Sequence, residues 1–157
     1  MGKILDVMLD FFREDDWKFY QLSDQTILRL DVSGRNGEWL CYANADEEGE
    51  YFSFYSTCPV KVPESKRVVM SELLTRINYG LRLGNFELDF SDGEIRYKTS
   101  IRVKDDRVTT ALIKHLVYAN VGMMDEYLPS IMALLYGNLS PQDAIAKVEG
   151  ESDAEWN

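Results

Sequence analysis

The strongest constraint on the fold is an aspartate–glycine pair with a strand-like run on each side. Asp92 and Gly93 separate residues 85–90 from residues 94–103, and both runs alternate apolar and polar side chains. An Asp-Gly pair between two alternating runs is typical of a β-hairpin with a tight turn. The sequence therefore predicts two antiparallel strands joined at Asp92-Gly93.

A two-residue turn would also determine which residues face each other across this hairpin. Apolar pairs then fall on one face of the ladder and oppositely charged pairs on the other. Such pairs contribute about 0.2–1 kcal/mol each, and a slip by one residue would bury charged side chains. The predicted pairs are Phe90 with Ile95, Asp89 with Arg96, Leu88 with Tyr97 and Glu87 with Lys98.

Four further strands are expected nearer the amino terminus. They are predicted at residues 17–22, 27–32, 38–44 and 51–57, with an Asn-Gly turn signal inside residues 33–37. The strand at residues 51–57 carries aromatic side chains on both faces, so its second face needs a cover. Helices on both faces, a partner subunit or a bound peptide would each supply one.

Apolar residues at three- and four-residue spacing predict the helices. Pro129 lies inside the third of them and should kink or interrupt it, because proline removes a helical hydrogen bond. Helices are expected at residues 3–13, from Pro63 to Gly80 or Gly84, from Val108 onward, and from Ser140 to about Val148.

The predicted element order is α-β-β-β-β-α-β-β-α-α, which favours an α+β fold with an antiparallel sheet packed by helices. A chain of 157 residues is long enough for one well-buried core. We expect a single domain over residues 1–148, followed by an acidic tail at residues 149–157 that is disordered.

Charge and hydropathy exclude several classes of partner. The chain has 17 Lys and Arg against 27 Asp and Glu, a net charge of −10. Nucleic acids and anionic membranes require clustered basic residues, so neither is expected to bind. No apolar run reaches the roughly 20 residues of a membrane-spanning helix, and the amino terminus lacks a signal-peptide pattern. A cytoplasmic location is therefore expected.

Candidate catalytic and metal-binding residues are few. His115 is the single histidine, and Cys41 and Cys58 are the two cysteines. A structural zinc site needs about four nitrogen or sulfur ligands, and no phosphate-binding glycine motif is present. We expect no cofactor, no metal and no catalytic residue, with His115 at the surface and both cysteines as reduced, partly buried strand residues.

Aromatic residues stand out, at 12% of the chain. Those on the central strands are candidates for a protein-contact surface, because large amphipathic rings are enriched where proteins bind one another. The candidates are Trp39, Tyr42, Tyr51 and Tyr55.

The segment from residue 76 to residue 97 resembles the YbjN-domain family of bacterial proteins, which is described in terms of sensory transduction regulation. The family pattern has an Asn on a helix, a G-x-F-x-[LV]-[DN] strand, a D-G turn and a [VI]-x-[YF] strand. Asp125-x-Tyr127-Leu128-Pro129 and the ending Gly137…Pro141…Ala144-Ile145 also fit. The matching central residues are Asn78, Gly84, Phe86, Leu88, Asp89, Asp92, Gly93, Ile95 and Tyr97.

The resemblance implies a fold similar to that of type III secretion chaperones, often dimeric. It also implies a non-enzymatic adaptor or chaperone-like module, here a homodimer, that binds another protein. It carries over no catalytic residues, and the matched positions have structural explanations, with Asn78 expected to hydrogen-bond a strand backbone. A small-ligand-binding sensor and a structural subunit of a larger assembly are the alternatives.

Overall fold

The computed structural model describes residues 2–22, 26–104 and 107–155, and its element order confirms the predicted one. The helices are α1 (Lys3–Glu14), α2 (Arg67–Tyr79), α3 (Thr110–Gly137) and α4 (Pro141–Glu155), with a 3-10 helix (Glu64–Lys66) before α2. The strands are β1 (Phe19–Gln21), β2 (Ile27–Ser33), β3 (Glu38–Asp46), β4 (Tyr51–Thr57), β5 (Asn85–Leu88) and β6 (Ile95–Arg102).

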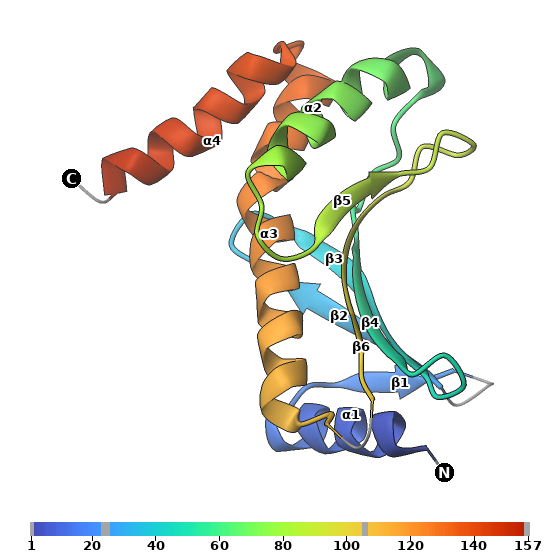
Figure 1. Cartoon of the computed structure of the whole chain (residues 1–157). Helices are drawn as coiled ribbons and strands as arrows, with labels where there is room; N and C mark the ends of the chain where they lie inside the picture. Colours follow the sequence, from blue (N-terminus) through green and yellow to red (C-terminus); the bar gives the residue numbers. More distant parts are fainter. Residues whose placement is uncertain (1, 23–25, 105–106, 156–157) are drawn as a thin grey trace.

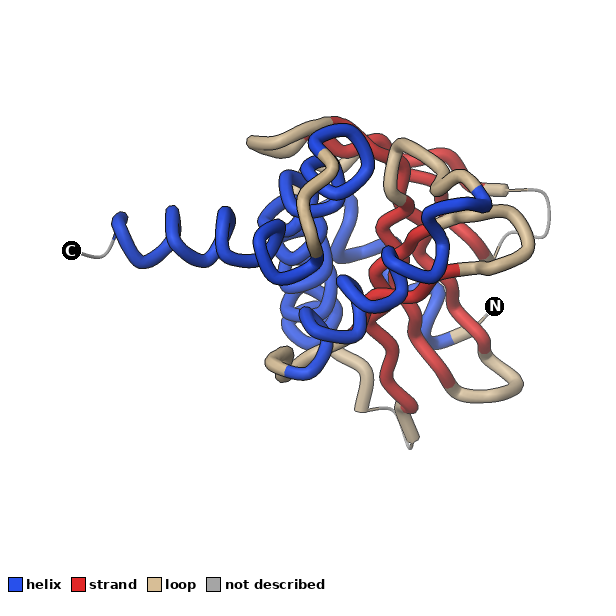
Figure 2. The backbone as a smooth tube through the Cα atoms, turned by 90° about the horizontal axis from the view of Figure 1, so that it is seen from above, coloured by secondary structure: helices blue, strands red, loops and turns tan. Residues whose placement is uncertain are grey.

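One antiparallel six-stranded sheet organises the molecule, in the order β1-β2-β3-β4-β6-β5. The sheet is curved, and α1 and α3 lie along one of its faces (Figure 1). Seen from above, α3 and α4 lie to one side of the strands, α2 passes in front of them, and the end of α4 projects away (Figure 2). We call the face toward α1 and α3 the inner face and the opposite one the outer face.

The core lies between the inner face and the helices. Phe12 of α1 stacks on Phe54 of β4 with ring centroids 6.3 Å apart, and both side chains are fully buried. Buried inner-face positions alternate with more exposed outer-face positions along β2 and β3, as the period of two predicted. Burial of this apolar surface is the main driving force for the fold.

The predicted register of the β5–β6 hairpin is wrong by two residues. The loop is longer than two residues because aspartate side chains stabilise it. The Asp89 carboxylate accepts a hydrogen bond from the Ser91 amide (2.8 Å), and Asp92 Oδ1 accepts one from the Glu94 amide (2.9 Å). A shift by two preserves the inner and outer faces. The observed pairs are Leu88 with Ile95, Glu87 with Arg96, Phe86 with Tyr97 and Asn85 with Lys98.

Of the two outcomes expected at Pro129, a kink or an interruption, the interruption is wrong, because α3 is continuous through it. Proline cannot donate to the carbonyl four residues earlier, which belongs to Asp125. That carbonyl instead accepts a hydrogen bond from Asn36 Nδ2 (2.8 Å) in the β2–β3 loop. The Asp125 carboxylate accepts the backbone amides of Arg35 (3.0 Å) and Asn36 (2.7 Å). The loop thus supplies the donor that Pro129 lacks.

Helix α4 begins as predicted, with Ser140 Oγ accepting the Asp143 amide at 3.2 Å. It ends at Glu155, beyond the end near Val148 that apolar spacing indicated. Residues 156 and 157 of the predicted tail lie outside the described residues, and the extent of the domain stays a prediction.

Candidate protein-binding surface

The outer face of the sheet is the candidate binding surface. No helix covers it in the described ranges, as Figures 1 and 2 show. One row of side chains crosses five strands, because residues paired across strands point to the same face. This row consists of Tyr20, Arg29, Tyr42, Tyr55 and Lys98.

Three of the four candidate contact residues share this outer face. Tyr42 pairs directly with Tyr55, and both are half-buried. Tyr51 lies toward the other end of β4 and is 43% exposed. Their role in contacting a partner stays a prediction.

Trp39 is not brought together with these tyrosines. It lies on the inner face, is only 4% exposed, and donates from Nε1 to Ser56 Oγ at 3.0 Å. Trp39 and Tyr42 are three positions apart on one strand, so their side chains point to opposite faces. The aromatic composition alone could not separate them, but strand parity could.

Two arginines on the outer face lie against aromatic rings. The Arg29 guanidinium lies 5.0 Å from the Tyr20 ring centroid, and that of Arg96 lies 4.5 Å from the Tyr55 centroid. Arg96 Nε also contacts Glu87 Oε1 at 2.8 Å. The contacts with Arg29 and Arg96 therefore restrict the rotamers of the Tyr20 and Tyr55 rings.

Glu87 bridges two cations, since Lys98 Nζ lies 3.1 Å from its Oε2. Burial, the largest single influence, raises the pKa of Glu87. Hydrogen bonds from Lys98 and Arg96, together with their charges, outweigh it, so that the pKa lies below its ordinary value. The carboxylate thus remains charged at neutral pH.

Asn78 has the backbone contact that the sequence predicted. Its Nδ2 donates to the Phe86 carbonyl (3.0 Å), and its Oδ1 accepts the Phe86 amide (2.8 Å). The amide and carbonyl of Phe86 point away from β6. Asp89 hydrogen-bonds across the hairpin to Glu94, and in an antiparallel pair such bonds recur at every second residue, so Phe86 does not make them. The side chain of Asn78 therefore occupies the outward edge of β5 at this residue, as a paired strand would.

Both glycines of the motif have positive φ. Gly84 (φ +79°) precedes β5, rather than ending α2, which is capped by Gly80. Gly93 (φ +83°) lies against the backbone of Val62, whose amide donates to the Gly93 carbonyl at 2.9 Å. A Cβ at residue 93 would lie 2.1 Å from the Val62 carbonyl oxygen, so only glycine fits there.

The apolar motif residues form the buried side of the hairpin, as expected. The rings of Phe86 and Tyr97 meet edge-to-face with centroids 4.8 Å apart, and Leu88 and Ile95 extend the same side. Burial raises the pKa of Tyr97 to about 12, and its hydroxyl donates to the Leu83 carbonyl. These positions hold the fold together and do not reach the outer face.

Asn120 is a buried polar residue that the sequence analysis did not single out. It is fully buried on α3, and its Nδ2 lies 2.9 Å from the Phe54 carbonyl and 3.0 Å from the Tyr97 carbonyl. It therefore ties α3 to β4 and β6. An amide within an apolar stripe of α3 was the signal that could have identified it.

The titratable groups considered for chemistry come from different parts of the fold: His115 from α3, Cys41 from β3 and Cys58 from the segment after β4. His115 is exposed on α3. Burial raises the pKa of the Cys41 thiol to about 12 and that of Cys58 to about 11. In the part of the chain that the structure describes, no group of three or more His, Cys, Asp or Glu residues is arranged to hold a metal ion. No helix among the described residues is both long and apolar enough to cross a bilayer.

Known structures share this fold. The crystal structure of YbjN from E. coli, described as "a putative transcription regulator", matches with a TM-score of 0.60 and 15% identity over 77% of this chain and 85% of that one. A chain of the ExsC–ExsE complex matches at 0.55 and 12% identity, over 82% and 95%. A chain of the HopA1–SchA chaperone–effector complex matches at 0.50 and 14% identity, over 78% and 91%. These similarities confirm the predicted chaperone-like α+β fold.

No curated protein matches the sequence. The YbjN family, described as "Putative bacterial sensory transduction regulator", matches residues 5–132. This range includes most of α1, the whole sheet, the Asn78 contact, the Asp92-Gly93 loop and most of α3. The chain therefore belongs to the YbjN family.

Proposed function

We propose that this chain is a non-enzymatic protein-binding module, a chaperone-like or regulatory adaptor whose partner contacts the outer face of the sheet. The observation that carries the proposal is the uncovered outer face with its tyrosines. Tyrosine suits such a surface because its ring buries large area while its hydroxyl stays hydrogen-bonded.

The structural neighbours support a protein as the partner. Two of them were solved as complexes, ExsC with ExsE and the chaperone–effector pair HopA1–SchA. The identities are low, so these neighbours support the class of partner and not its identity. The acidic charge of −10 favours a partner with basic segments and speeds their encounter at low salt.

A matched pair of variants tests the proposal. The tagged full chain would be used to capture partners from the lysate of its source cell, with complexes read by native mass spectrometry. We expect a defined heterocomplex that is weakened by Tyr51→Ala with Tyr55→Ala. Tyr79→Ala with Tyr136→Ala is the control, because these tyrosines are 96% and 72% exposed away from the outer face.

Other outcomes of the same experiment would contradict the proposal. A bare chain with no captured protein would remove the adaptor role. A bound small-molecule mass without a protein would favour the ligand-binding sensor. Aggregation of the isolated chain, relieved by one stoichiometric partner, would favour a structural subunit. Equal capture by both double variants would move the contact away from the outer-face tyrosines.

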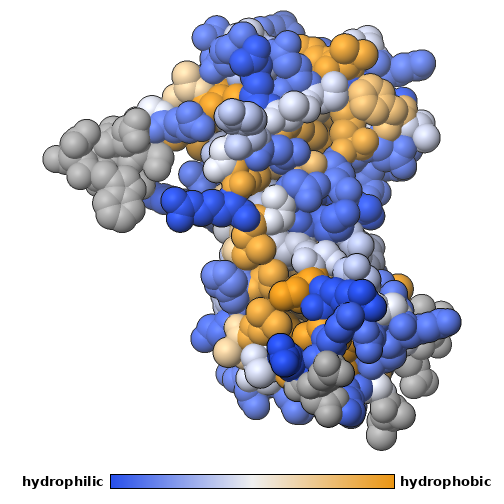
Figure 3. Space-filling view, in the orientation of Figure 1, coloured by the Kyte–Doolittle hydropathy of each residue, from blue (hydrophilic) through white to orange (hydrophobic). Residues whose placement is uncertain are grey.

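The proposal includes a homodimer in the cytoplasm. Val68 on α2 is 75% exposed, Val69 is 38% exposed, and Phe90 in the neighbouring hairpin loop is 54% exposed. Apolar side chains are visible where α2 begins (Figure 3). A self-complementary apolar patch suits a two-fold interface. Light scattering should give twice 18.1 kDa for the wild type, and Val68→Ser should lower it.

A further inference from the structure

An open groove lies at the end of the sheet where β2 ends, β3 begins and β4 ends, and both outer-face residues and buried inner-face residues line it. Its volume is about 630 Å³. This lies within the roughly 300–1,000 Å³ of known ligand pockets, so it accommodates a few side chains and not a folded domain. The lining residues are Asp31, Val32, Ser33, Glu38, Trp39, Leu40, Thr57, Cys58 and Pro59.

The floor of the groove is apolar. Leu40, on the outer face of β3, is 39% exposed, although β3 is an interior strand of the sheet. Its direct neighbours across the strands are Asp31 and Thr57, so no apolar side chain faces it there. Trp39 and Cys58 complete the floor, and the thiol stays neutral because burial raises its pKa. The strand neighbours of Leu40 leave its side chain exposed, whereas an apolar group of a ligand would bury it.

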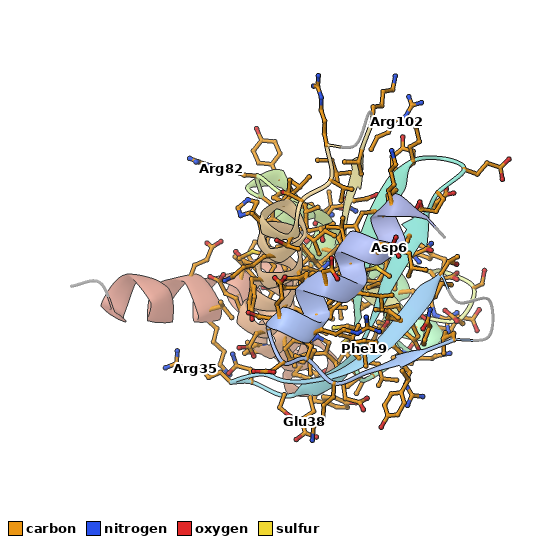
Figure 4. The ribbon with its side chains drawn as sticks, turned by 90° about the horizontal axis from the view of Figure 1, so that it is seen from below. Asp6, Phe19, Arg35, Glu38, Arg82 and Arg102 are labelled. Carbon is orange, nitrogen blue, oxygen red and sulfur yellow. The ribbon has the colours of Figure 1, made fainter. Side chains whose placement is uncertain are left out.

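The rim of the groove is acidic. Asp31 and Glu38 are exposed, and Glu38 points outward from the body of the protein (Figure 4). Among the residues that the structure describes, no Lys or Arg lines the groove. Arg96 lies in the same cross-strand row as Leu40, but it is paired with Glu87 at 2.8 Å and stacked on Tyr55. The negative rim therefore attracts a cation.

We propose that this groove binds a short basic segment of a protein partner, with one apolar side chain on Leu40 and a neighbouring Lys or Arg against Asp31 or Glu38. The inference rests on the proposed adaptor function and names the chemistry of its partner. A protein segment fits better than a small cation, because Leu40 and Thr57 of the groove lie in the cross-strand row next to that of Tyr42 and Tyr55, on the same face. A chain leaving the groove can continue along that row.

Fluorescence anisotropy with peptide probes tests this inference on the full chain. The probe is a labelled dodecapeptide of alternating Leu and Arg, compared with matched Leu/Glu and Ser/Arg peptides. We expect the Leu/Arg peptide to bind at least about tenfold more tightly than either, because one apolar contact or one desolvated charge pair suffices for that factor.

Two groove variants and two matched controls locate the binding. Leu40→Ser should weaken Leu/Arg binding about tenfold, as should Asp31→Asn with Glu38→Gln. Leu22→Ser is the first control, since Leu22 is 36% exposed near the other end of β2. Asp6→Asn with Asp10→Asn, on α1, is the second and removes the same charge. Circular dichroism verifies that each variant is folded.

Three outcomes would overturn the inference. Equal binding of Leu/Arg and Ser/Arg peptides would reduce the effect to net charge. Equal weakening by the α1 control would do the same. Unchanged binding in Leu40→Ser would place the site elsewhere. Suppose that the groove variants still capture the native partner while the double variant Tyr51→Ala with Tyr55→Ala does not. In that case the groove is not the binding site for the basic segment, and the adaptor function stands. If the wild type captures no partner, the adaptor function fails whatever the peptides do.

Discussion

The side-chain amide of Asn36 donates to the backbone carbonyl of Asp125 at 2.8 Å, one helical turn before Pro129. The two residues are 89 positions apart in the sequence. Pro129 leaves this carbonyl without its helical donor, and the β2–β3 loop replaces that donor. The same loop places its Arg35 and Asn36 amides on the Asp125 carboxylate, so a proline-containing helix and a hairpin stabilise each other.

This relationship predicts coupling between Asn36 and Pro129. Asn36→Ala should destabilise the wild type by about 0.5–1.5 kcal/mol, because the Asp125 carbonyl loses its donor. In a Pro129→Ala background the new amide can donate to that carbonyl, so the same change should cost less. Urea unfolding of the four proteins measures the coupling. Identical costs in both backgrounds would contradict the explanation.

The Asn78 contact predicts a loss of overall stability when the edge of β5 loses its side-chain partner. Asn78→Ala leaves the Phe86 amide and carbonyl without their side-chain partner, which should cost about 1–3 kcal/mol. Thr75→Ala, at an exposed position of the same helix, is the control and should change the free energy of unfolding by less than about 0.5 kcal/mol. Chemical denaturation gives both values, and equal effects of the two substitutions would argue against the contact.

Asn120 should be more important for stability than its single side chain suggests. Asn120→Ala removes donors from the Phe54 and Tyr97 carbonyls inside the core and leaves a small cavity. We expect destabilisation of about 2–4 kcal/mol, from lost hydrogen bonds and lost packing together. The control is His115→Ala, on the exposed side of α3. Thermal unfolding compares the two, and a small effect of Asn120→Ala would show that α3 is held by apolar packing alone.

The ion pairs of Glu87 predict a pH-dependent term in stability. The pKa of Glu87 is lower in the folded state, so its contribution is present above the ordinary value of 4.5 and is lost as pH falls through the lower folded value. At pH 7 the free energy of unfolding of the wild type should exceed that of Glu87→Gln by about 0.2–1 kcal/mol. The difference is small because the charged groups of these ion pairs are partly exposed. Denaturation at several pH values should find this difference shrinking below pH 4.5. High salt at pH 7 should also reduce it. If the difference in the free energy of unfolding stayed constant from pH 7 to below pH 4.5, the ion pairs of Glu87 would not be its cause.

The β5–β6 hairpin marks where sequence-based prediction succeeded and where it ended. Alternation identified both strands and the buried side that includes Phe86 and Tyr97 correctly. The loop length was not predicted, because Asp89 and Asp92 can stabilise a wide loop by side-chain bonds as readily as a narrow turn. A shift by two residues leaves every face unchanged, so the hydrophobic pattern could not detect it.

The candidate surface was anticipated in part. The sequence pointed to aromatic residues on the central strands, and the structure places Tyr42, Tyr51 and Tyr55 on the outer face. It places Trp39 in the core, where its indole donates to Ser56. The acidic-rimmed groove around Leu40 was not anticipated, because its residues come from the ends of three strands.

The sequence by itself determined the element order and the inner and outer faces of the strands. Each of these depends on local stereochemistry or on a short periodicity. Only the tertiary structure decided the continuity of α3 through Pro129, the capping of the β5 edge by Asn78, and the shape of the groove. These features depend on donors and acceptors that are distant in the chain, and their pairing is established only when the sheet and helices pack together.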